Sequence, residues 1–331
     1  MQRLHLSRVL PHLTQFPARI LARARRTPTC WTAVDCSASG LLGVSLAPAL
    51  HPGGMPQVMK AGVVEASTLS TAGLTQLAAH IAVPSTRWVF VLPRADYRVL
   101  VVAEPQVPAD EITQSLRWQL APLLDFPVDE AVLDYITIPT RTWQAEQAQE
   151  LYAFAAQADA MQEIADLFRT AKINLCAIDV AETAQRNLAV LAAQAEEGLG
   201  MVVFGEQQVQ IIFSWHGELY MDRLIAESLA DDVGHPERTA AASARIVLQL
   251  QRSLDALRTN FPFVAINRIV IAGAPATFSA ALADTIPLSV ETLQLERLFD
   301  LSHAPQLADP AVGMRYVTAL GAALREMESA P

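Results

Sequence analysis

The sequence has few of the residues and segments that bind metals, cross-link a chain or anchor it in a membrane. Its 331 residues include three cysteines, Cys30, Cys36 and Cys176, no two of which form a CxxC pair, and its seven histidines are scattered. We therefore expect neither a zinc site nor a disulfide framework, and a reducing, cytoplasmic location fits best. No apolar run approaches the roughly 18 residues that a membrane-spanning helix requires.

Lysine is also scarce, and the net charge is negative. The only two lysines, Lys60 and Lys172, lie outside any GxxxxGKS/T sequence, which excludes a P-loop nucleotide site. The formal net charge of −10 argues against general binding of nucleic acid, because phosphates select basic surfaces.

Apolar residues, by contrast, are abundant. They make up 52% of the chain, and the mean hydropathy is +0.25. Such a composition favours large cores and an additional buried surface for a partner. The length suffices for two ordinary domains or for one two-lobed unit.

Positive charge is concentrated at the start of the chain. Residues 1–30 contain six arginines and no acid, so this segment carries +6 and the remainder −16. Leu6, Val9, Leu10 and Leu13 add an apolar stripe at helical spacing. One interpretation is a basic arm that contacts anionic lipid or an acidic partner. The other is a loosely ordered terminal tail.

Two stretches have the pattern of a β-hairpin. Trp31–Ala49 consists of two apolar runs around the small polar turn Ser37–Gly40, and Gly200–Tyr220 repeats the pattern with a turn at Gly205–Gln208. Each hairpin precedes further strand and helix patterns. The sequence therefore predicts a duplicated α/β chain with a cleft between its halves.

The first half is interrupted by a segment of different character. Pro93–Asp96 breaks the pattern, and Tyr97 to about Ala171 predicts a small α+β insertion before a buried strand resumes at Asn174. Within it, four acids lie close together in sequence and could imitate paired catalytic carboxylates. They flank a helix–strand turn, so a solvated or partner-facing loop is the better interpretation. These acids are Asp125, Asp129, Glu130 and Asp134.

Five markers in order resemble the superfamily of actin, sugar kinases and heat-shock chaperone ATPases. The resemblance implies two phosphate hairpins, an adenosine strand–turn and two small-residue helices that connect the lobes. In this chain they correspond to Asp35–Gly40, Val203–Gln208, Ile271–Pro275, Asp179–Asn187 and Val317–Leu324. The fold implied is a duplicated ribonuclease-H-like, actin-like fold with two lobes and an inserted subdomain.

The insertion narrows the resemblance to PilM/MshI-like proteins of type IV (MSHA-type) pilus biogenesis. Val107–Ile112, Leu116–Leu120 and Phe126–Glu130 look like the extra subdomain of that group. The resemblance implies a cytoplasmic protein, peripheral to the inner membrane, that binds the N-terminal tail of a bitopic PilN/MshJ-like partner. It also implies the following division: arm 1–30, first lobe 31–96 and 172–195, insertion 97–171, second lobe 196–311, and a returning helix 312–331.

The nucleotide markers depart from the superfamily pattern. Asp35 is kept, but Ser37 stands where a phosphate-binding glycine is usual, and Val203 stands where an acid is usual. In the second turn Gly205 is followed by Glu206, which adds negative charge. The late turn keeps Gly273 but continues with Ala274 and Pro275, and proline has no N–H to donate. The alternative for each of these residues is that a hairpin or strand end needs a turn there, with no contact to a ligand. The resemblance thus implies an ATP/Mg²⁺ site that is weak or lost.

Two functional hypotheses follow. The first is a scaffold protein that docks an extended peptide between the first lobe and the insertion, with Leu100 and Val102 of the strand Tyr97–Ala103 as the groove wall. A wholly buried core strand is the alternative for that stretch. The second hypothesis is an active ATPase or kinase on the same fold, which would need the metal-organising acids that Val203 and Ser37 fail to supply.

Overall fold

The computed structural model describes residues 30–37, 40–49, 51, 53–66, 68–140, 149–193, 197–229 and 236–325. The predicted basic arm lies outside these ranges except for Cys30. Part of the first turn, Ala38 and Ser39, also lies outside them, as do residues 326–331 of the predicted C-terminal helix.

The first sheet has five strands in the order β3-β2-β1-β4-β8. β1 and β2 form the predicted antiparallel hairpin, and β4 and β8 extend the sheet in parallel. The hairpin strands are almost entirely buried, and two helices, α1 and α8 (Val317–Ala323), pack against them. The bounds are β1 Trp31–Ser37, β2 Gly40–Ala47, β3 Gln57–Val64, β4 Arg87–Val91 and β8 Leu175–Asp179, with α1 at Thr71–Ile81.

The second sheet repeats this arrangement, in the order β11-β10-β9-β12-β13. Again an antiparallel hairpin, β9–β10, is flanked by a third antiparallel strand and by two parallel strands. The predicted duplication is therefore confirmed. The bounds are β9 Gly198–Phe204, β10 Val209–Trp215, β11 Glu218–Ile225, β12 Ile266–Ala272 and β13 Ser289–Thr292, with α5 at Pro236–Asn260 and α6 at Ala276–Ala283.

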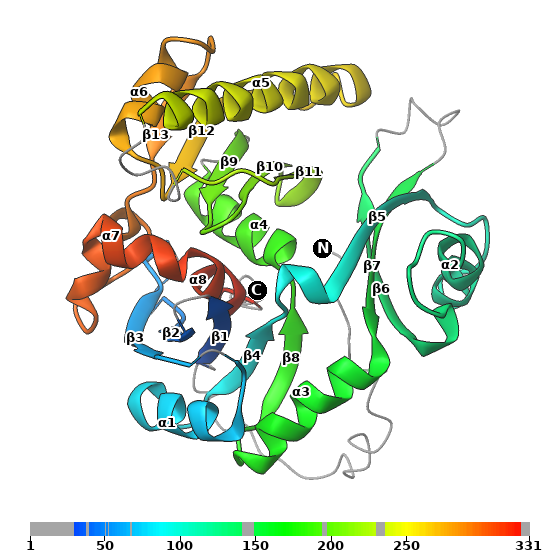
Figure 1. Ribbon diagram of the computed structural model, residues 1–331, viewed down its shortest axis with the longest axis vertical. Coiled ribbons are helices and arrows are strands. Elements are labelled where there is room, and N and C mark those ends of the chain that lie inside the picture. The colour runs from blue at the N-terminus through cyan, green and yellow to red at the C-terminus, as the bar shows by residue number, and fades with distance from the viewer. Residues whose placement is uncertain are drawn as a thin grey trace.

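A third, antiparallel sheet of order β5-β7-β6 lies beside the two lobes (Figure 1). β5 does not continue the first sheet, because the 3₁₀ turn η3 at Arg94–Asp96 redirects the chain where the sequence pattern breaks. One face of this sheet packs under α2 in a small core of its own, formed by Ile112, Leu116, Leu120, Leu151 and Ala153. The bounds are β5 Tyr97–Ala103, α2 Ile112–Leu120, the 3₁₀ turn η4 Val128–Glu130, β6 Ala131–Ile138 and β7 Glu150–Gln157.

Helix α3, Ala158–Thr170, leads from the third sheet back to the first. Its fully buried Phe168 meets Phe90 of β4 edge to face, with ring centroids 5.7 Å apart. The domain boundaries given above stay predictions. α3, assigned there to the insertion, shares its buried face with the first sheet.

Two helices rich in small residues, α4 (Ala181–Ala192) and α8 (Val317–Ala323), cross where the lobes meet. They approach so closely that a Cβ on Gly321 would lie 2.0 Å from the carbonyl oxygen of Ala184. The side chain of Asn187 adds a hydrogen bond to the carbonyl oxygen of Gly321 at 3.1 Å. Before α8 come the short turns η6 Leu295–Arg297, η7 Pro305–Ala308, α7 Pro310–Gly313 and η8 Met314–Tyr316.

Within the described ranges, no helix is both long and apolar enough to cross a membrane.

Candidate functional site

The turns predicted to hold a nucleotide lie close together. β9 and β12 are parallel neighbours in which Val203 pairs with Ala272, so the turns that begin at Gly205 and Gly273 leave adjacent strand ends. The end of the first hairpin lies close enough to the turn of the second for the charge of Glu206 to raise the pKa of Asp35. Strand pairing and electrostatics thus place Asp35, Gly205 and Gly273 around one region between the lobes.

The electrostatics of this region are unfavourable for an anion. Burial, opposed by the hydrogen bond from the N–H of Cys36 and reinforced by the negative charge of Glu206, raises the pKa of Asp35 to about 7. Nothing in the described part of the chain brings three or more His, Cys, Asp or Glu side chains together as a metal-binding group. The first and second hairpins therefore contribute two mutually repelling acids.

Packing already explains the glycines of two turns. Gly273 has φ +83°, and a Cβ there would lie 3.0 Å from the carbonyl oxygen of Phe204. Gly40 has φ +134°, and its Cβ would lie 2.3 Å from the carbonyl oxygen of Val64. Ser37 donates its hydroxyl proton to the carbonyl oxygen of Gly40 at 3.2 Å, and half-buried Ala274 packs against the large core. Together with the paired acids, these residues fit Mg-ATP poorly.

The carboxyl group that ends β8 is held by protein groups. Asp179 is 1% exposed and forms an ion pair with Arg325, at 3.1 Å, from the end of α8. Its other oxygen accepts hydrogen bonds from the N–H of Val180, at 2.9 Å, and from the hydroxyl of Thr183. Asp179 therefore ties the two connecting helices together.

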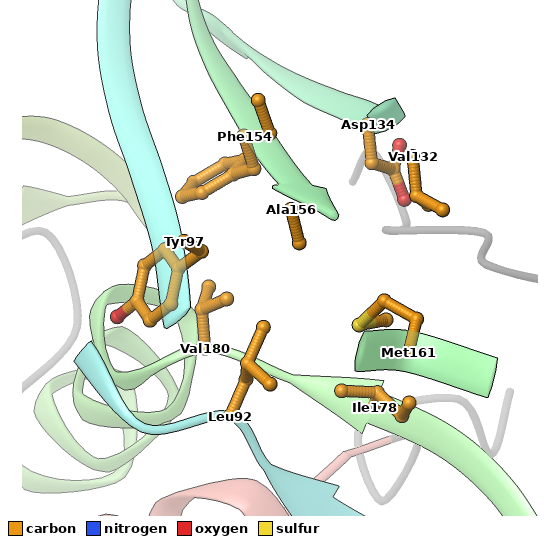
Figure 2. A pocket seen from close by; sticks show the side chains of 10 residues that line it. Leu92, Tyr97, Val132, Asp134, Phe154, Ala156, Met161, Ile178 and Val180 are labelled. Atoms are coloured by element: carbon orange, nitrogen blue, oxygen red, sulfur yellow. The ribbon is translucent and has the colours of Figure 1, made fainter. Parts of the chain in front are cut away.

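A cavity lies between the first sheet and the inserted sheet (Figure 2). Its empty volume is about 360 Å³, part of which is open to solvent. Leu92, Ile178 and Val180, at the ends of β4 and β8, form one side, and side chains of β5, β6, β7 and α3 form the others. The lining from the inserted sheet and α3 comprises Tyr97, Val132, Asp134, Phe154, Ala155, Ala156 and Met161.

The cavity is apolar apart from one carboxyl group. Asp134 supplies that group, and the Tyr97 hydroxyl points away from the cavity toward Glu182, which accepts its hydrogen bond at 2.7 Å (Figure 2). The cavity also adjoins three strands that are last in their sheets, β8, β6 and β5. Such edges offer backbone groups to an added strand. The arrangement can accept an extended peptide with apolar side chains.

Leu100 and Val102, predicted from the sequence as the groove wall, do not line this cavity. Side chains alternate between the faces of a strand, and these two pack on the other face, against the small core under α2. Tyr97 of the same strand does line the cavity, at the register position opposite Ala156. Sequence reasoning missed Tyr97, although an aromatic residue directly after the Pro93–Asp96 break was a usable signal.

No protein-family model matches the sequence, and no curated protein matches it. The structure is similar to a solved PilM–PilN type IV pilus biogenesis complex, with TM-score 0.68, 17% identity, and coverage of 90% of this chain and 98% of that one. Two other solved structures are less similar. One is a Bacteroides thetaiotaomicron protein with actin-like ATPase fold and unknown function, with TM-score 0.48, 9% identity, and coverage of 85% of this chain and 96% of that one. The other is the cytoplasmic domain of EpsL, an inner membrane component of the Vibrio cholerae type II secretion system, with TM-score 0.45, 9% identity, and coverage of 73% of this chain and 82% of that one. The predicted actin-like fold is thus confirmed.

Proposed function

We propose that this chain is a PilM-like scaffold of an inner-membrane platform for a type IV pilus, of MSHA type, or for a related secretion system. In this proposal it holds the N-terminal tail of a bitopic, PilN-like membrane protein. The observation that carries the proposal is the apolar cavity beside the edge strands of two sheets, in a chain that matches a PilM–PilN complex over 90% of its length.

The cavity suits an extended tail for physical reasons. A peptide laid along β8 or β6 gains backbone hydrogen bonds, while every second side chain enters the space between the sheets. Burying one leucine-sized side chain there contributes roughly 1.5–3 kcal/mol. Asp134 favours a tail that brings a basic side chain or an N–H donor beside its apolar residues.

The runner-up, an active ATPase or kinase, is disfavoured by the paired acids Asp35 and Glu206 and by Val203 at the metal-organising position. We propose that the nucleotide region is degenerate. Mg-ATP should then leave the thermal midpoint of the protein unchanged. The double variant Ser37→Gly with Val203→Asp should bind Mg-ATP better than the unmodified chain, and robust Mg²⁺-dependent turnover by the unmodified chain would overturn this part of the proposal.

We further propose that the protein works at the cytoplasmic face of the inner membrane. The six arginines of residues 1–30 would each add roughly 1 kcal/mol of attraction close to an anionic lipid surface. Sedimentation with vesicles that contain or lack anionic lipid, using the full chain and a variant with these arginines changed to glutamine, tests that contact.

The decisive experiment for the scaffold is a titration with tail peptides. Eight-residue peptides from the N-termini of bitopic inner-membrane proteins of the same organism are titrated into the full chain. Ala156→Leu places additional carbon atoms into the cavity and should abolish binding of the retained peptide. Ala103→Leu is the matched control, because it makes the same change at an exposed position of the same sheet.

The outcomes separate cleanly. Loss of binding in Ala156→Leu with retention in Ala103→Leu supports docking in the cavity. Equal binding by both variants would place the tail elsewhere. If no tail binds the unmodified chain, the scaffold assignment itself is wrong.

A further inference from the structure

The outer face of α2 exposes apolar side chains that the inserted sheet does not cover. α2 packs on that sheet through Ile112, Leu116 and Leu120, and Figure 1 shows it on the outer side of the sheet. Its opposite face consists of exposed residues at helical spacing, namely Gln114, Trp118, Ala121 and Pro122, with Leu123 directly after them. Trp118 is 78% exposed and Leu123 is 55% exposed. Large apolar side chains gathered on one exposed face favour an interaction surface.

Four exposed acids border this outer face. Two of them directly precede α2 and two lie in η4, which is held beside the helix by Arg117. The Arg117 guanidinium donates to the carbonyl oxygen of Val128 at 2.6 Å and to that of Ala131 at 3.2 Å. These border acids are Asp110, Glu111, Asp129 and Glu130.

The charge of the inserted unit favours a basic partner. Its described residues, 97–140 and 149–157, contain eight acids and two arginines, which gives a net charge of −6. Both arginines already have partners within the unit, because Arg117 holds η4 and Arg98 pairs with Asp125 at 2.6 Å. Such a surface repels anionic lipid and nucleic acid. The outer face of α2 therefore fits a segment that is both positively charged and amphipathic.

The beginning of the same chain has this chemistry. Residues 1–29 contain six arginines and no acid, so their charge of +6 balances the −6 of the inserted unit. Leu6, Val9, Leu10 and Leu13 supply an apolar stripe at helical spacing in this segment. The segment thus offers arginines to the border acids and apolar side chains to the face between them.

The connection to β1 is long enough for this contact and favours it within one molecule. Residues 14–30 span up to about 55–60 Å when extended, whereas a compact chain of this length has a radius of gyration of about 20 Å. A tethered segment meets its surface at an effective concentration on the order of millimolar. At micromolar protein that concentration favours the segment of the same chain over the segment of a second copy.

We propose that residues 1–29 dock on the outer face of α2, with their apolar stripe against Trp118 and Leu123 and their arginines beside the border acids. The docking itself does not depend on the proposed function. Its consequence rests on the proposed membrane contact: a segment held on the inserted unit is withheld from anionic lipid, so the two surfaces compete for it.

Photo-crosslinking from position 118 detects the docking directly. The full chain with p-benzoylphenylalanine in place of Trp118 is irradiated at micromolar concentration, and the crosslinked peptides are identified by mass spectrometry. We expect crosslinks to residues 1–29 at the mass of a monomer. They should disappear at high ionic strength, which screens the charges, and in the variant with the six arginines changed to glutamine. The same residue in place of Leu248, 44% exposed on α5, is the control and should not reach the segment. Absence of the crosslink from position 118, or its appearance between two molecules only, would overturn docking within one chain.

Vesicle sedimentation measures the competition. The triple variant of three border acids should release the segment and raise the affinity of the full chain for vesicles with anionic lipid. The expected gain is about threefold, the factor for a segment that is docked about two-thirds of the time. The substitutions are Glu111→Gln, Asp129→Asn and Glu130→Gln.

A second triple variant is the matched control, because it makes the same change of charge at exposed residues outside the inserted unit. Its substitutions are Glu237→Gln, Asp284→Asn and Glu296→Gln. It should bind vesicles like the unmodified chain, and equal affinities of the two triple variants would overturn the competition. If none of these proteins binds anionic vesicles, the proposed membrane contact fails, and the crosslinks alone decide whether residues 1–29 dock on α2.

Discussion

Replacing Gly321 by alanine tests whether the crossing of α4 and α8 holds the two lobes together. The new Cβ would lie 2.0 Å from the carbonyl oxygen and 2.6 Å from the carbonyl carbon of Ala184. Real Cβ contacts essentially never fall under 3.0 Å. Because the obstacle is backbone, the helices must separate by roughly 1 Å, an overpacking that costs about 1–3 kcal/mol.

Two further effects nearly cancel. Separation lengthens the 3.1 Å hydrogen bond from Asn187 to the carbonyl oxygen of Gly321, at a cost of about 1 kcal/mol. Alanine recovers up to about 1 kcal/mol over glycine in a helix. We therefore expect Gly321→Ala to lower the free energy of unfolding by about 2 kcal/mol, measured by urea titration followed by circular dichroism.

Gly73→Ala is the matched control. This glycine also lies in a helix, α1, but its Cβ would meet the flexible end of Leu41 at 2.9 Å rather than backbone. We expect its free energy of unfolding to stay within about 0.5 kcal/mol of the unmodified protein. If Gly321→Ala proves as stable as this control, the helices are not in close contact and the reasoning is refuted.

Three other predictions follow from buried groups. Arg325→Met leaves Asp179, 1% exposed, without its cation and should cost about 3–5 kcal/mol in urea titrations; a loss under about 1 kcal/mol would show that the pair does not join the helices. Phe168→Ala removes the ring that α3 packs on Phe90 and should cost about 3–5 kcal/mol, whereas a change at exposed Trp118 to serine should stay within about 0.5 kcal/mol. Burial and the charge of Glu206 raise the pKa of Asp35 to about 7, so the contribution of Asp35 to stability is present below about pH 4 and is lost as the pH rises through 7. Glu206→Gln should therefore raise the thermal midpoint at pH 8 more than at pH 5. An equal gain at both pH values would show that the two carboxyl groups do not interact.

Patterns that are local in sequence predicted the fold well. The helix Pro236–Asn260 has the bounds expected from its starting proline and its stripe of Ile246, Leu250, Leu254 and Leu257, because helix ends and stripes depend on nearby residues. The break at Pro93–Asp96 likewise marked the passage into the inserted sheet. The duplicated hairpins were readable for the same reason.

The site was harder to predict, because its geometry arises between distant segments. Strand alternation places Tyr97 and Leu100 on opposite faces of β5. The sequence of the strand does not show which of these faces α2 covers, and therefore which residue can line the cavity. Glu182 could have been noticed as an acid on the buried stripe of α4, three and seven positions before buried Gln185 and Ala189. Its hydrogen-bond partner Tyr97 belongs to the inserted sheet, and no local pattern brings the two side chains together.

The return of α8 to the first sheet sets an order of events during synthesis. α8 packs against β1, β2 and β4, and Asp300 accepts the N–H of Val58 at 2.9 Å. The second sheet needs only contiguous chain, whereas β1 of the first sheet waits for α8, which is made about 285 positions later. At about 5–20 residues per second this delay is on the order of 15–60 s. During that time the first strands of the nascent chain expose apolar side chains that α8 later covers. The N-terminal strands are therefore the part of the protein that stays exposed longest before folding is complete.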